Sequence, residues 1–205
     1  MSSSIHDPAV PGLTPYQLGL RNRFLAAPQV APPAPWRSVF EACAPVGGLV
    51  GIGFGTDPES GGDLVMVVSH SGHGLFDALT GERIARDPDP EPDGDLPDGP
   101  DLSCPGPGPL AGTRVRIAGL YGGGLHTTAP GGWHVEVVAP DWPHERVLLC
   151  APGGRPHSGP HGEGWWHVFH SRWSELRAVG FSPSGRTLAV ATSSDLTLWS
   201  RDDRR

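Results

Sequence analysis

The sequence predicts an all-β protein, built as an array of antiparallel sheets with three to four strands each. The 205 residues include 30 glycines and 24 prolines, which favours many tight turns and disfavours long helices. Runs in which apolar residues alternate with small or polar ones lie between these turns, as expected of short strands. A similar order of runs occurs three times, at 50–84, 116–150 and 178–199.

The first 35 residues are expected to form an arm in front of a sheet domain that covers residues 36–205. Within the arm, residues 16–25 can form a short helix. Thr14 can cap its amino end, and Pro15 suits the first helical position. Four prolines follow and end the helix.

The first copy contains strand patterns at 50–55, 63–70 and 75–84. Gly61 and Gly62 mark the turn between the first two patterns, because glycine tolerates the backbone angles of tight turns. The copy is therefore predicted to be an antiparallel meander.

Residues 87–112 are expected to form a long, Pro-rich surface loop. Seven residues of the stretch 87–101 are acidic and none is basic, so the net charge of −7 lies there and the rest of the chain sums to zero. Such a tract cannot bury apolar surface, and its carboxylates repel one another. We therefore expect residues 86–111 to be dispensable for folding. A calcium site is not predicted, because Pro100 stands where a calcium loop needs its bidentate acid.

The second copy begins with a strand pattern at 116–122 and continues through 133–138 to 146–150. A loop at 152–164 follows it. Residues 165–170 are then predicted to form the strand that precedes the third copy.

The third copy has the clearest pattern. Residues 178–181 lead into a turn that contains Pro183 and Gly185, and residues 187–192 then alternate between larger side chains and alanines. Pro presets the turn and Gly tolerates a positive φ. Residues 196–199 alternate again, so three short strands are predicted.

This order of elements, ending in Trp199, closely resembles one blade of a WD-repeat β-propeller, with Ser200 where that family usually has Asp. The two earlier copies are weaker matches. The resemblance implies a partial β-propeller-like array, in which a strand at 36–43 completes the last blade, because the third copy has no fourth strand. It also implies that loops form a binding surface. A β-sandwich is the alternative fold.

Composition excludes several classes of enzyme. The chain has no lysine, so all 15 of its basic residues are arginine. A P-loop and a Schiff-base site both need a lysine amine. The bias toward Ala, Gly, Pro and Arg is typical of a GC-rich, actinobacterial genome. The three cysteines are far apart, which indicates neither a disulfide framework nor a zinc knuckle.

Charge and hydropathy limit the location and the partners. The amino-terminal residues carry neither a basic region nor a hydrophobic run, and no later run has the length of a transmembrane helix. A cytoplasmic protein without a membrane partner is therefore predicted. Nucleic acid is not predicted as a partner, because no arginine cluster with interleaved aromatic residues occurs.

The leading functional hypothesis is a non-catalytic protein–protein interaction module that presents loops on a propeller-like scaffold. Its partner would be another protein, or a second copy that pairs with open sheet edges. The candidate partner-binding residues are Trp142, Trp165, His73 and His126. Trp142 lies in a turn between prolines and is the best candidate for an exposed anchor.

Two other functions stay open. One is a metal-binding protein or hydrolase that uses a histidine cluster. The histidines considered for it are His70, His73, His126 and His134. The pairs at 70 and 73 and at 167 and 170 are three residues apart, a spacing that points side chains to opposite faces of a strand. Neither pair is expected to chelate a metal by itself.

The other open function is an immunity or accessory protein of a bacterial defence or toxin locus. No acid, base and nucleophile converge in the sequence pattern. We therefore assign no catalytic residue, no cofactor and no metal ligand.

Overall fold

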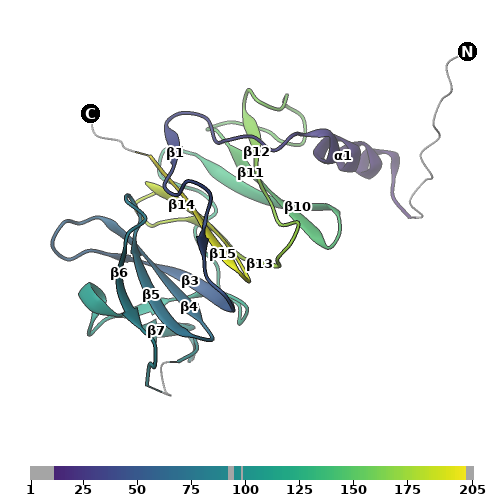
Figure 1. The fold of residues 1–205 in the computed structure, drawn as a ribbon. Helices are drawn as coiled ribbons and strands as arrows, with labels where there is room; N and C mark the ends of the chain where they lie inside the picture. The colour runs from purple at the N-terminus through teal and green to yellow at the C-terminus, as the bar shows by residue number, and fades with distance from the viewer. Residues whose placement is uncertain (1–11, 92–94, 98, 202–205) are drawn as a thin grey trace, which may run out of the picture.

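The computed structural model describes residues 12–91, 95–97 and 99–201. In this part of the chain, strands form antiparallel sheets, none of which closes into a barrel, and helix contributes little (Figure 1). The prediction of an all-β protein is confirmed.

The elements follow one another along the chain in this order: α1 (Pro15–Ala26), β1 (Trp36–Ser38), β2 (Ala44–Pro45), β3 (Leu49–Thr56), β4 (Asp63–Ser69), β5 (Gly72–Asp77), β6 (Arg83–Asp87), β7 (Ser103–Pro105), the 3-10 helix η2 (Gly108–Leu110), β8 (Arg114–Arg116), β9 (Ala118–Gly119), β10 (His134–Asp141), β11 (His144–Cys150), β12 (Trp165–His170), β13 (Leu176–Phe181), β14 (Thr187–Thr192) and β15 (Asp195–Arg201). Sheet I has the strand order β6-β5-β4-β3-β9, and sheet II has the order β10-β11-β12. Sheet III has the order β1-β15-β14-β13, with β2 also paired to β15, and β7 pairs with β8 as a separate hairpin.

Helix α1 forms where the sequence predicts it. Thr14 caps its amino end, because the Thr14 side chain accepts a hydrogen bond from the Gln17 backbone and the Gln17 side chain accepts one from the Thr14 backbone. Pro15 occupies the first turn, as expected. Phe24 is the buried residue of the helix, so the helix is attached to the protein through its carboxyl-terminal half.

Sheet I confirms the meander predicted for the first copy, since β3, β4, β5 and β6 pair in sequence order. The prediction for the second copy is wrong in one part. The segment at 116–122 contributes β9, which pairs with β3 of sheet I and not with the strands that follow. Glycines allow this close pairing: a Cβ on Gly51 would lie 2.6 Å from the Ala118 carbonyl oxygen. Sheet II instead takes its third strand from residues 165–170.

Sheet III contains the three short strands predicted for the third copy, since β13, β14 and β15 pair antiparallel in sequence order. The predicted turn between β13 and β14 is closed by a 2.8 Å hydrogen bond from the Gly185 amide to the Ser182 carbonyl, and Gly185 has a φ of +71°. Strand β1 pairs antiparallel with β15, so that Trp36 lies opposite Arg201 and Ser38 opposite Trp199. The expected fourth strand from the amino-terminal side is therefore present.

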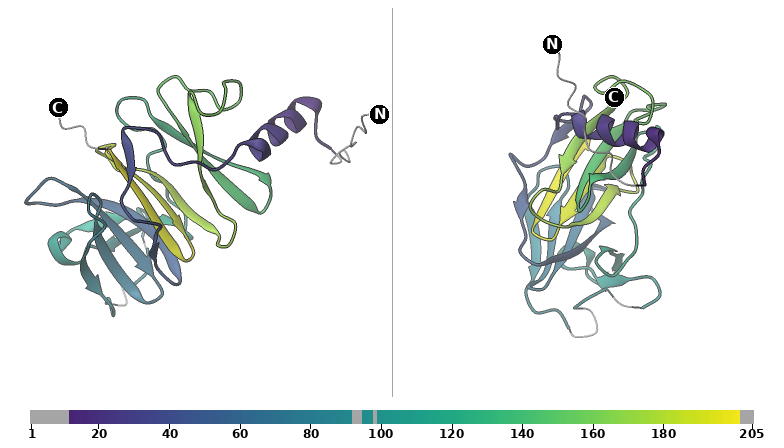
Figure 2. Two further views of the ribbon diagram at one scale, coloured as in Figure 1. Left: turned by 45° about the horizontal axis from the view of Figure 1, so that its top comes forward. Right: turned by 90° about the vertical axis from the view of Figure 1, so that its right-hand side faces the viewer.

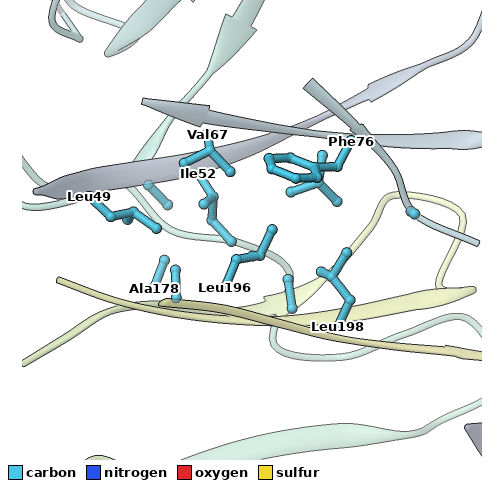
Figure 3. Close-up of a cluster of buried hydrophobic side chains, with 12 residues drawn as sticks. Leu49, Ile52, Val67, Phe76, Ala178, Leu196 and Leu198 are labelled. Atoms are coloured by element: carbon cyan, nitrogen blue, oxygen red, sulfur yellow. The ribbon is translucent and has the colours of Figure 1, made fainter. Parts of the chain in front are cut away.

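The three sheets stack face to face, with sheet III between sheets I and II (Figure 2). Strand β14 explains this arrangement, because its side chains alternate between the two interfaces. Ala189 and Ala191 pack toward sheet I, whereas Leu188 and Val190 pack toward sheet II. Figure 3 shows the first interface, where Leu49, Ile52, Val67 and Phe76 of sheet I meet Ala178, Leu196 and Leu198 of sheet III. The sheet formed last along the chain is thus the central layer.

Other segments cover the outer faces of the stack. Helix α1 packs on sheet II, where Phe24 and Ala27 contact Leu148, Cys150 and Trp165 in one buried cluster. The segment that contains β7, η2 and β8 covers sheet I.

The expectation of a dispensable loop at 86–111 is wrong for its second half. Ser103 and Cys104 in β7 are fully buried, and Leu110 in η2 is 4% exposed. The sequence pattern missed this packing because its apolar residues are single ones between prolines and glycines, without any periodicity. Cys104 and Leu110 therefore belong to the buried core of sheet I.

Replacing Leu110 with alanine is therefore expected to lower the free energy of unfolding by about 2 kcal/mol, at the low end for a buried leucine because η2 lies at the edge of the core. Chemical denaturation measures this change. Leu79→Ala is the control, because Leu79 is 48% exposed and its truncation should have little effect. Equal losses in the two variants would mean that η2 is not packed on sheet I.

Candidate functional site

The structure separates the four candidate partner-binding residues. Trp142, in the turn between β10 and β11, is 80% exposed, as expected of an anchor. His126 is exposed too, and its carbonyl accepts a 2.7 Å hydrogen bond from the Phe181 amide at the edge of β13. Trp165 and His73 are 1% and 2% exposed and cannot contact a partner.

Trp165 is a core residue because α1 lies over it. Its ring meets the Phe24 ring edge to face at 5.9 Å, and the Arg23 guanidinium lies 5.3 Å from its centroid. The indole nitrogen donates a 2.8 Å hydrogen bond to the Gly159 carbonyl. His73 is held in a similar way, since its Nε2 donates to the Asp95 carbonyl at 3.0 Å. Both predictions of a partner-binding role were therefore wrong.

A second exposed tryptophan, which sequence reasoning missed, lies on a loop that is joined to the loop of Trp142. Trp173, in the loop between β12 and β13, is 95% exposed. The two loops are joined by hydrogen bonds: the Ser171 amide donates to the Glu145 carbonyl, and the Glu145 amide donates to Ser171 Oγ, each at 2.9 Å. We name residues 141–145 and 170–174 the tryptophan tip, since both loops lie at one end of sheet II.

The sequence contained a signal for Trp173. It stands alone in a polar run between the strand patterns at 165–170 and 178–181, which is an unfavourable place for a core residue. The sequence did not predict that Trp142 and Trp173 lie on joined loops, because this depends on the pairing of β11 with β12.

A polar cluster lies at the base of the tip and shares Asp141 and His170 with it. The expectation that His167 and His170 point to opposite faces is wrong, because a bulge in β12 sets His167 opposite Leu148 and His170 opposite Arg146. Val168 takes up the extra position, and the two imidazole rings lie 5.7 Å apart.

Arg146 connects this cluster to helix α1. Its Nη1 donates a 2.7 Å hydrogen bond to the Phe24 carbonyl, and its Nε lies 3.6 Å from Asp141 Oδ1. His167 Nδ1 donates to the Ala27 carbonyl at 3.0 Å. Nε2 of His167 and of His170 are buried without a hydrogen-bond partner. The cluster is thus tied to the helix but incompletely satisfied.

Charge and burial keep His170 neutral. Burial, with the positive charges of Arg146 and Arg172, lowers the pKa of His170 to about 4. Its Nδ1 accepts a 3.0 Å hydrogen bond from Arg172 Nε, which also requires the neutral ring. Burial likewise lowers the pKa of His167.

This geometry predicts that stability falls on acidification from pH 6.5 to 4. In that window the unfolded chain protonates His170 while the folded protein does not, so unfolding is favoured as pH falls. We expect His170 to contribute on the order of 2 kcal/mol to the difference between pH 7 and pH 4. Urea denaturation across this range measures it. His170→Gln should flatten the profile, whereas His126→Gln, at an exposed position, should keep it. Identical profiles for His170→Gln and the parent would contradict the assignment.

A second polar cluster bridges sheets I and III. Asp63 Oδ2 in β4 accepts hydrogen bonds from the hydroxyls of Ser182 (2.8 Å), Ser184 (2.6 Å) and Thr187 (3.0 Å). The carboxylate lines a pocket of 380 Å³ together with Arg186. Asp63 belongs to sheet I, whereas the three hydroxyls belong to β14 of sheet III and the turn before it. These hydrogen bonds therefore connect the two sheets.

The four histidines considered for metal binding do not gather. Among the described residues, His134 alone of the four belongs to a group of three or more possible metal ligands, with Glu136 and Cys150. Cys150 is fully buried, and burial together with the nearby Glu136 carboxylate raises the pKa of its thiol to about 12. This group lies on sheet II at the end opposite the tryptophan tip.

The fold and the tip define an all-β protein of stacked antiparallel sheets with two exposed tryptophans on joined loops. Comparisons with protein-family models, with curated proteins and with solved structures find no match to this chain. Across the described residues, no helix has both the length and the apolar character needed to cross a membrane.

Proposed function

We propose that this protein is a non-catalytic interaction module that binds another protein through the tryptophan tip. The observation that carries the proposal is the exposure of Trp142 and Trp173, at 80% and 95%, on two loops held together by one backbone hydrogen bond and one hydrogen bond to the Ser171 hydroxyl. These two side chains expose apolar surface that the fold does not bury. A partner that covers this surface removes it from water, which favours binding.

The size of the tryptophans supports a protein partner. A buried aromatic side chain removes about 150–250 Å² from water, so the two together provide several kcal/mol on covering. Tryptophan is also enriched among the residues that dominate protein interfaces. The sheet pairing behind the loops limits the entropy that ordering the tip would cost on binding.

The proposal includes the resemblance to WD-repeat propellers, and the contacts between sheets III and I are its support. Strand β13 contacts β3 and β9, so the first strand of the third copy adjoins the first strand of the first copy. Propellers bring the inner strands of their blades together in a related way and bind partners through loops. The tip would then be a loop surface at the end of one blade.

Site-specific photocrosslinking tests the proposal. A photoreactive amino acid is placed at position 142 or 173 in the full chain, in the cells that naturally produce it. Position 121 is the control, since Tyr121 is 48% exposed but lies in the turn after β9 of sheet I. We expect the same protein to be linked from both tip positions and not from the control.

The linked protein is then purified and its affinity measured. Trp142→Ala and Trp173→Ala should each weaken binding by about thirtyfold or more, the range of an interface hot spot, and Tyr121→Ala should not. Crosslinks to a second copy of this chain alone, or unchanged affinity in both tryptophan variants, would overturn the proposal.

A further inference from the structure

We propose that His134, Glu136, Cys150 and His157 form a binding site for a zinc ion on the helix-covered face of sheet II. His134 and Glu136 are two residues apart on β10 and therefore point to the same face. Cys150 on β11 is the cross-strand partner of His134. The possible ligand atoms of these three residues all lie within 4.8 Å of one another, and His134 Nε2 lies 3.8 Å from Glu136 Oε1.

The loop between β11 and β12 brings the fourth ligand. His157 Nε2 donates a 2.7 Å hydrogen bond to Glu136 Oε2, so its imidazole already lies at the edge of the group. The loop is held in place by α1: Arg23 Nε donates to the Pro156 carbonyl at 2.6 Å, and the Phe24 ring packs edge to face on His157 at 5.6 Å. His157 is therefore positioned by contacts outside the site.

The donor set suits zinc among the common metal ions. Imidazole nitrogen, thiolate sulfur and carboxylate oxygen are its usual ligands, and structural zinc sites have four of them. Around a tetrahedral zinc, ligand atoms lie about 3.5 Å apart, given bond lengths of about 2.0–2.3 Å. The ligand atoms of His134, Glu136 and Cys150 would reach that spacing by side-chain movements on the order of 1 Å, and His157 would turn from Glu136 toward the ion. Calcium and magnesium, which prefer oxygen ligands only, fit poorly.

Zinc binding would remove the proton of the Cys150 thiol. A Zn–S bond forms as the S–H bond of Cys150 breaks, and the proton leaves to solvent. The Glu136 carboxylate and two neutral imidazoles supply the remaining electron pairs. The ion would fix residues 151–164 to sheet II, at the opposite end from the tryptophan tip.

Cobalt substitution and calorimetry test the site. The full chain is freed of metal with a chelator, and Zn²⁺ alone is titrated into it. We expect one ion per chain, and we expect Co²⁺ to give the visible bands of a tetrahedral site together with a sulfur-to-cobalt charge-transfer band. Cys150→Ala should abolish the charge-transfer band, and His134→Gln should weaken zinc binding at least about tenfold.

His144→Gln is the matched control, because His144 is an exposed histidine at the other end of the same strand pair. If Cys150→Ala does not fold, the charge-transfer band of the parent and the affinity of His134→Gln decide the question. The proposal is overturned if the parent shows no sulfur-to-cobalt band, or if His134→Gln binds zinc as tightly as the parent and the His144 control.

Discussion

Replacing Trp199 with alanine is expected to lower the free energy of unfolding by about 3–5 kcal/mol, the usual cost of emptying a buried site of this size. Trp199 is 5% exposed and belongs to the cluster between sheets III and II, with Trp36, Phe181 and Leu188. It also lies opposite Ser38 in the pairing of β15 with β1. The cavity would therefore weaken both the central interface and the strand that completes sheet III.

Equilibrium denaturation by urea measures this loss. Trp173→Ala is the matched control, since it removes the same side chain from a position that is 95% exposed. Its free energy of unfolding should stay within about 0.5 kcal/mol of the parent. If the two variants unfold at the same urea concentration, Trp199 is not a core residue and the assignment of β15 is wrong.

Replacing Asp63 with alanine is expected to lower the free energy of unfolding by about 3–4 kcal/mol. Three hydroxyl groups would lose the charged acceptor that they share. The Asp63 side chain is 7% exposed, and its hydrogen bonds to Ser182, Ser184 and Thr187 connect sheet I to the β13–β14 turn of sheet III. The loss should exceed that of any single hydroxyl, such as in Ser184→Ala.

A double-mutant cycle checks whether the cluster acts as proposed. Asp63→Ala and Ser184→Ala should show a coupling of about 1 kcal/mol or more when combined. Asp57→Ala is the control, because the Asp57 carboxylate accepts hydrogen bonds from the Glu59 backbone and the Ser60 hydroxyl, both within its own turn. Additive losses, or an Asp63 variant no less stable than the control, would show that the cluster does not hold the sheets together.

Local patterns predicted most of the strands. Alternation and glycine turns gave the meanders of β3 to β6 and of β13 to β15, because both signals depend on residues that are neighbours in the chain. The pairing of β1 with β15 was expected from the resemblance to propellers, in which an amino-terminal strand often completes the last blade. The helix was predicted from Thr14 and Pro15 at its start and from the prolines that follow it.

Long-range pairing could not be predicted from the same signals. Strand β9 has only two residues, and its place beside β3 depends on close backbone contact at Gly51 and Gly119. The stacking order of the sheets likewise depends on which apolar faces of the strands pack against each other. The order of the strands along the chain does not determine it.

The candidate site was predicted only in part. Trp142 was expected to be exposed from its turn, but Trp165 became a core residue because α1 folds back over it. The bulge in β12 reversed the expected directions of His167 and His170, and a one-residue bulge leaves no trace in the spacing of side chains. Trp173 and the partners of Cys150 required the pairing of β11 with both of its neighbours.

The central position of sheet III has a consequence for how the chain folds during synthesis. Its strands come from residues 36–45 and 176–201, so the ribosome must release residue 201 before either main interface can close. Sheet I can form earlier on its own second core of Leu64, Met66, Leu75, Cys104 and Ile117, with one apolar face still exposed. The two main interfaces should therefore form together and late, once β15 has left the ribosome and sheet III can pack between sheets I and II.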